Sequence, residues 1–147
     1  MNLSFLMPYL VTIAVAWTIA HVIKYVIATV QTRSARNFGR FFASGDMPSA
    51  HTATTVALMV AIGLNEGFAS AVFALAALFA GVVMYDAVTV RRSSGEQGQA
   101  LVALLKEQKS NVPVPMVAKG HTPLELLVGA LLGALISLGI HVIYVAT

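Results

Sequence analysis

Two long runs of apolar residues, one near each end of the chain, most constrain what this sequence can fold into. Residues 3–30 hold one charged side chain, Lys24, and Glu125 opens a second apolar run that reaches Thr147. Both runs exceed the roughly 20 residues with which a helix crosses the hydrocarbon core of a membrane. The 147-residue chain is 58% hydrophobic and 10% charged, whereas soluble domains carry about 25% charged residues. We therefore expect an all-α integral membrane helical bundle.

The middle of the chain holds two more apolar runs, residues 49–64 and 68–88. Only Asn65-Glu66-Gly67 separates them, and so short a polar break predicts a turn between antiparallel helices. The first of these runs is short for a full span, so we expect it to tilt or to be shielded partly by protein. With the two terminal runs, the pattern predicts one membrane-embedded domain, residues 1–147, with about four transmembrane helices.

The basic residues indicate how these helices are oriented. All nine Lys and Arg residues are Lys24 or lie in two loops, residues 31–47 (Arg33, Arg36 and Arg40) and 89–120 (Arg91, Arg92, Lys106, Lys109 and Lys119). In a bundle of four spans these two loops fall on one side, and loops rich in Lys and Arg face the cytoplasm. We therefore expect both termini outside and the basic loops in the cytoplasm.

Four further features refine the expected architecture and the possible chemistry. Residues 94–109 place three leucines on one side of a helix, which predicts a short amphipathic helix at the membrane interface. The prolines within residues 111–115 end that helix before the last span. Gly129 and Gly133, four residues apart, predict close packing of the last helix. The chain has no cysteine, which excludes disulfides and zinc-thiolate sites.

His51 lies at a polar entrance to the second apolar run. Pro48 fits the first turn of a helix and Ser49 is a good capping residue, so this helix presents backbone N–H groups to the loop. A helix start of this kind favours bound anions, and imidazole near neutral pH acts as a nucleophile or a proton donor. A capped helix start with an interfacial histidine explains the same residues without chemistry, and both interpretations stay open.

His121 and Glu125 form the second candidate cluster. They lie four residues apart, and Pro123 fits the first turn of the last helix, so the carboxylate can lie beneath the imidazole. A carboxylate that accepts from one ring nitrogen fixes the tautomer and leaves the other nitrogen free to attack. The alternative is a glutamate that caps its own helix. Because both helices start from the basic side, we expect His51 and His121 to share one membrane face.

Arg91 and Arg92 follow the third apolar run. They can grip phosphate oxygens through forked hydrogen bonds, or they can serve only to hold their loop in the cytoplasm. Asp86 is costly to leave unpaired near the end of a span and is expected to meet Lys24 or one arginine. Lys24 can reach for headgroups or point inward at a bound anion. The other two histidines have no motif around them and are given no role: His21 and His141.

Taken together, these segments resemble the type 2 phosphatidic acid phosphatase superfamily, which includes vanadium-dependent haloperoxidases, and in particular its small divergent branch of bacterial and plastid membrane proteins. The resemblance covers about residues 24–133 and rests on three blocks in order. The blocks are Met47-Pro48-Ser49-Ala50-His51-Thr52-Ala53, Tyr85-Asp86-Ala87 with Val90-Arg91-Arg92-Ser93-Ser94-Gly95-Glu96-Gln97, and Gly120-His121-Thr122-Pro123-Leu124-Glu125 followed by Gly129.

The resemblance implies hydrolysis of a lipid phosphomonoester or a polyprenyl diphosphate, with neither a metal nor another cofactor. It implies that His121 is the nucleophile that forms a phosphohistidine, that Glu125 orients it, and that His51 protonates the leaving oxygen. The phosphate-binding residues that it implies are Lys24, Ser49 and Ala50.

The chain departs from the superfamily pattern at several positions. The arginine that usually stands six residues before the nucleophile is Pro115 here, so Arg91 or Arg92 is our candidate to replace it. Ala50 stands where glycine is usual, and Glu125 replaces the usual aspartate. No arginine of the first basic loop is followed by proline, and four spans replace six.

These departures keep a second function open, that of a noncatalytic phospholipid-binding or scaffolding membrane protein that retains the anion pocket. In either case we expect membrane lipids as partners and no nucleic acid. A homodimer is one expected arrangement, because a second copy would help so small a bundle to enclose its site. We expect the protein in the inner membrane of a bacterium, with the site on the cytoplasmic side.

Overall fold

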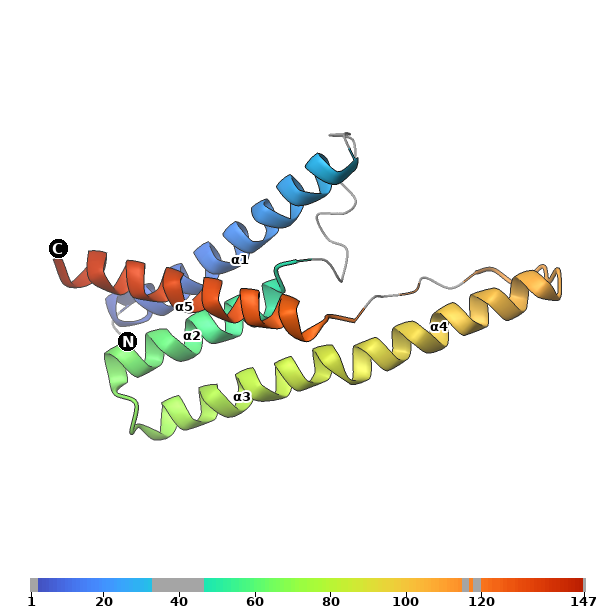
Figure 1. Cartoon of the computed structure of the whole chain (residues 1–147). Helices are drawn as coiled ribbons and strands as arrows, with labels where there is room; N and C mark the ends of the chain where they lie inside the picture. The colour runs from blue at the N-terminus through green and yellow to red at the C-terminus, as the bar shows by residue number, and fades with distance from the viewer. Residues whose placement is uncertain (1–2, 33–46, 115–116, 118–119, 147) are drawn as a thin grey trace.

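The computed structural model describes residues 3–32, 47–114, 117 and 120–146, and within these residues helices joined by turns and loops are the regular secondary structure, with no strand. Five helices follow one another in the described part of the chain (Figure 1): α1 (Leu3–Thr32), α2 (Ala50–Glu66), α3 (Ala71–Val88), α4 (Val90–Glu107) and α5 (Pro123–Ala146). The predictions that concern Arg33, Arg36, Arg40, Pro115 and Lys119 lie outside the described residues. The all-α fold class is confirmed.

The helices form a bundle around α2, which packs against α1, α3 and α5. Figure 1 shows that α1 and α3 run in one direction and that α2 and α5 run in the other. Both ends of the chain lie at one end of the bundle, and the starts of α2 and α5 lie together at the opposite end. His51 and His121 are therefore brought to the same end, as the sequence predicts.

Three helices of the described chain are long and apolar enough to cross a membrane: α1, α3 with its continuation α4, and α5. The fourth predicted span, α2, has 17 residues, which gives a length of about 25 Å at 1.5 Å per residue. Its buried face holds four alanines at helical spacing, Ala50, Ala53, Ala57 and Ala61. Shielding by three neighbouring helices explains how so short a helix lies inside the bundle. With these helices, the protein is an all-α membrane protein.

Glycine at two positions lets α5 lie directly against α2. A Cβ added at Gly129 would lie 2.6 Å from the carbonyl oxygen of Ser49, and one added at Gly133 would overlap the carbonyl oxygen of Ala53. Real Cβ atoms do not approach so closely, so the interhelical distance depends on both glycines. The predicted packing role of Gly129 and Gly133 is confirmed.

Two predicted boundaries differ from the structure. α2 continues to Glu66, and the turn to α3 comprises residues 67–70, with Gly67 at a φ of 90° and the Ser70 hydroxyl accepting from the N–H of Phe73 at 3.2 Å. Gly67 is needed there because side chains are disfavoured at positive φ. The turn therefore comes after Asn65 and Glu66 rather than at them.

The amphipathic helix also differs from its prediction. α4 begins at Val90 instead of Ser94, and it continues in the direction of α3 beyond the rest of the bundle instead of turning across it (Figure 1). No proline interrupts residues 86–94, so nothing in the local sequence stops the helix at the end of the span. Leu101 and Leu104 of α4 are exposed.

We expect Gly133→Ala to destabilise the bundle, because the new methyl group has no space against α2. Thermal unfolding in detergent micelles should show a loss of about 1–3 kcal/mol, the usual range for overpacking. Gly139→Ala is the matched control, since an added Cβ there meets nothing within 4 Å. The control should be neutral or gain up to about 1 kcal/mol from helix propensity. Equal melting temperatures for the two variants would contradict the close contact.

Candidate active site

His121 and Glu125 meet at the start of α5. The Nδ1 atom of His121 lies 2.9 Å from Oε2 of Glu125, and the imidazole is only 4% exposed. A carboxylate only accepts hydrogen bonds, so Nδ1 carries the proton and Nε2 of a neutral ring holds the lone pair. The pair therefore has the orientation that a nitrogen nucleophile requires.

Glu125 also caps its own helix. Its Oε2 accepts from the backbone N–H of Thr122 at 3.1 Å, and the N–H of Glu125 donates to the Thr122 hydroxyl at 3.3 Å. These reciprocal bonds form a capping box. The two interpretations of Glu125 that the sequence left open are both satisfied, since one carboxylate orients His121 and caps α5.

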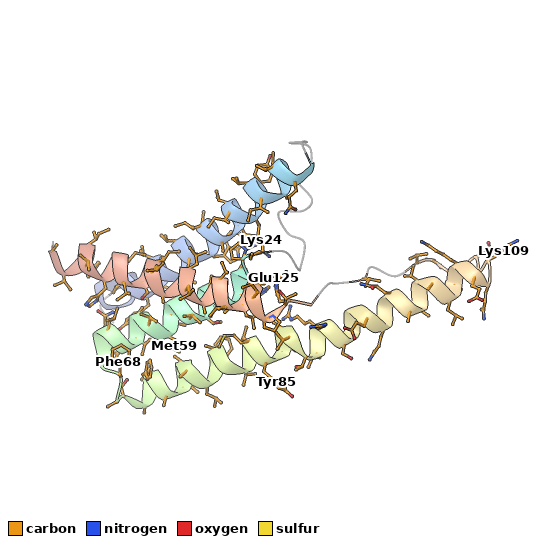
Figure 2. The ribbon with its side chains drawn as sticks, in the orientation of Figure 1. Lys24, Met59, Phe68, Tyr85, Lys109 and Glu125 are labelled. Carbon is orange, nitrogen blue, oxygen red and sulfur yellow. The ribbon has the colours of Figure 1, made fainter. Side chains whose placement is uncertain are left out.

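Backbone contacts hold this helix start against three other elements. The N–H of His121 donates to the carbonyl oxygen of Ala87 at the end of α3 at 3.1 Å, and the N–H of Ser49 donates to that of Glu125 at 3.2 Å. Gly120 lies so close to the backbone of Arg92 that any Cβ would overlap it. The end of α3 and the starts of α2, α4 and α5 therefore meet at one place, the region around the Glu125 label in Figure 2.

At the start of α2, the predicted phosphate-binding residues are buried. Ser49 is 0% exposed and Ala50 is 2% exposed. The Ser49 hydroxyl accepts from the N–H of Thr52 at 3.4 Å and lies 3.0 Å from the Thr52 hydroxyl. Ala50 packs against Ala20 of α1 in a small apolar cluster. The Ser49 side chain thus serves as a helix cap in this structure.

His51 is exposed and lies among basic groups. Arg91, His121, Lys24 and His21 all act on it electrostatically. Within the described part of the chain its ring makes no hydrogen bond, so His51 differs from His121, which has a carboxylate partner. The structure therefore brings His51 to the same region but does not orient it.

Two residues of α1 border this region. Lys24 is only 6% exposed, and Figure 2 shows it at the end of the bundle where Glu125 lies. Because Lys24 is buried, the interpretation in which it points inward at a bound anion is favoured over the one in which it reaches for headgroups. His21, given no role from the sequence, is also buried, and its Nδ1 lies 2.8 Å from the carbonyl oxygen of Trp17. His21 lies three residues before Lys24, and this spacing is the one sequence signal that would have placed His21 near the site.

The two arginines have carboxylate partners. Nε of Arg91 lies 2.6 Å from Oδ2 of Asp86, which confirms that Asp86 pairs with an arginine. Nε of Arg92 lies 3.2 Å from Oε1 of Glu96, one helical turn away. Both pairs are well exposed, so each contributes about 1 kcal/mol or less to stability.

A pocket of about 360 Å³ lies beside the nucleophile candidate. Among the predicted site residues, it is lined by His121, Glu125 and Arg92, whereas His51, Lys24 and Ser49 are not part of its lining. Ala50, Arg91 and Asp86 also lie outside it. The complete described lining is Arg92, Gly95, Glu96, Gln99, Gly120, His121, Thr122 and Glu125.

Sequence reasoning missed the pocket wall formed by Glu96 and Gln99 of α4. The signal was their helical spacing from Arg92, four and seven residues, which places all three on one face.

No group of three His, Asp or Glu side chains among the described residues is arranged to hold a metal ion.

Comparison with known proteins agrees with this architecture. The model of a family described as the divergent PAP2 family matches residues 6–136. An uncharacterized membrane protein of Bacillus subtilis (strain 168), YuiD, is 33% identical over 134 residues, which cover 81% of this chain and 84% of that protein. No solved structure matches significantly. Since the family model spans most of the chain, the protein belongs to the divergent PAP2 family.

Proposed function

We propose that the protein is a membrane phosphatase that hydrolyses a lipid phosphomonoester or a polyprenyl diphosphate through a phosphohistidine. The observation that carries this proposal is the His121–Glu125 pair, 2.9 Å apart, on the rim of a polar pocket. Membership of the divergent PAP2 family supports it.

In the proposed first step, Nε2 of His121 attacks phosphorus. The bond between phosphorus and the ester oxygen breaks, and His51 gives its proton to the leaving oxygen. Glu125 stabilises the positive charge that develops on the His121 ring. Water then attacks the phosphohistidine, His51 takes a proton from that water, and the P–N bond breaks to release phosphate and neutral His121.

Basic side chains would neutralise the phosphate during both steps. Both arginines have a carboxylate partner, but Arg92 lines the pocket with His121, whereas Arg91 is not part of its lining. Of the two candidates for the role that Pro115 cannot fill, we therefore favour Arg92. Arg91 and Lys24 lie on the His51 side of the site, where their positive charges act on that imidazole.

One observation supports a noncatalytic lipid-binding or scaffolding protein as the second candidate. Both arginines are held by carboxylates, Asp86 and Glu96, at 2.6 and 3.2 Å. A site that had lost turnover would keep such pairs. Vanadate, a phosphate mimic, separates the two functions: an enzyme would be inhibited by it, whereas a binder would show no turnover on any lipid phosphate.

We expect His121→Ala to abolish phosphate release, because the substitution removes the nitrogen proposed to attack phosphorus. Purified protein in detergent, supplied with phosphatidic acid, should lose activity by at least about 10³-fold, the scale seen when a nucleophile is removed. His141→Ala, on the same helix but near its far end, should retain activity. Equal phosphate release from wild type and His121→Ala would remove His121 as the nucleophile.

Glu125→Gln should separate the two roles of this side chain. A glutamine still accepts from the Thr122 N–H, so the capping box and the melting temperature should be kept. The neutral amide cannot stabilise a positive imidazole, so kcat should fall by about 10²-fold or more. Glu125→Ala should lose activity and also about 1 kcal/mol of stability. Full activity in Glu125→Gln would mean that the carboxylate serves only the helix.

We further propose that the site faces the cytoplasm and that both termini face outward. The chain has no cysteine, so Ala69→Cys in the turn before α3 and Ser110→Cys after α4 each introduce one reactive thiol. In bacterial spheroplasts, a membrane-impermeant maleimide should label Ala69→Cys directly and Ser110→Cys only after permeabilisation. The reverse pattern would place the site on the outer face.

A further inference from the structure

The pocket beside His121 is larger than a phosphate group requires. At about 30 Å³ per water molecule, its 360 Å³ equals the volume of about a dozen waters. A phosphate group has far fewer heavy atoms than that. The remaining volume lies toward α4, where Arg92, Glu96 and Gln99 form the wall.

The pocket is also more polar than an apolar tail requires. Its described lining contains glycines and side chains that form hydrogen bonds; it includes no aliphatic side chain, and its aromatic ring is the imidazole of His121. A different groove, at the opposite end of the bundle, shows what an apolar lining looks like in this protein, with Leu10, Ile13, Leu58 and Ile62. The space toward α4 therefore suits a polar substituent of the substrate.

The charges on the α4 wall limit which polar group of the substrate can bind there. Arg92 and Glu96 lie 3.2 Å apart. The proposed function uses the charge of Arg92 for the phosphate at His121, so a second anion finds no further cation on this wall, and an ammonium group would meet repulsion from Arg92 beside the attraction of Glu96. A hydroxyl group can donate to the Glu96 carboxylate and accept from an N–H of Gln99 or Arg92. A carboxylate has several lone-pair sites, so Glu96 can bind a hydroxyl and keep its contact with Arg92.

We propose that Glu96 and Gln99 are specificity-determining residues that bind a hydroxyl group close to the substrate's phosphate, so that the site takes phosphate monoesters of polyols. This inference rests on the proposed function, which places the phosphate at His121. It extends that function by defining the part of the substrate beyond the phosphate.

The test compares two lipids that differ in this hydroxyl group. Oleoyl lysophosphatidic acid has a free hydroxyl beside the phosphate ester, and oleyl phosphate has none. In the same detergent micelles, kcat/KM should be about tenfold higher for the hydroxylated lipid, the scale of one net hydrogen bond. Glu96→Ala and Gln99→Ala should each bring this ratio close to one. Glu107→Ala, at the end of the same helix and outside the pocket, should keep the ratio of the wild type.

The outcomes distinguish this inference from the proposed function. Absence of turnover, or turnover that survives His121→Ala, would overturn the proposed function itself. Turnover that needs His121 but shows equal kcat/KM for the two lipids, or a ratio unchanged by Glu96→Ala and Gln99→Ala, would overturn only the polyol specificity. A third substrate, glycerol phosphate, tests whether the natural substrate is a lipid or a soluble polyol phosphate. Hydrolysis as efficient as that of the lipid would support a soluble polyol phosphate, and weaker hydrolysis would support a lipid.

Discussion

The carboxylate of Glu125 is the group on which the geometry of the site depends. Its Oε2 accepts from the imidazole of His121 and from the backbone N–H of Thr122, while the backbone carbonyl of the same residue accepts from Ser49. One residue thus caps α5, fixes a tautomer and joins α5 to α2. A side chain that does all of this cannot be assigned to structure or to chemistry alone.

Close backbone contact is the second constraint. Gly129, Gly133 and Gly120 each lie where a Cβ would meet neighbouring backbone atoms. The first two bring α5 onto α2, and the third brings the loop before His121 onto the first turn of α4. Because these contacts join backbones, the relative position of His121, the start of α2 and Arg92 does not depend on long side chains that sample several rotamers.

Much of this could be predicted from the sequence because the signals are local or short in range. The apolar runs predict the helices, and the positions of the basic loops predict that both histidines lie at one end of the bundle. The spacing of His121 from Glu125 predicts their contact. Asp86 needed a cation, and Arg91 was the nearest in sequence. These inferences required only helical geometry and the cost of an unpaired charge in a membrane.

The rest depends on how segments pack in three dimensions. Whether Ser49 offers its hydroxyl to a ligand or to its own helix depends on α5, which buries it. The spacing of Glu96 and Gln99 from Arg92 places all three on one face of α4, but that this face lines the pocket depends on the contact of Gly120 with the backbone of Arg92. That contact leaves no periodic signal in the sequence, and the burial of His21 depends likewise on the contact between α1 and α2.

The parallel course of α2 and α5 has a consequence for stability. Two helix starts lie side by side, and each carries a partial positive charge of about half a unit from its aligned peptide dipoles. They repel one another, and the glycine contacts hold them together. An anion bound in the pocket at the start of α5 offsets the positive charge there and lowers that repulsion, so an occupied site and a cohesive bundle favour each other by thermodynamic linkage.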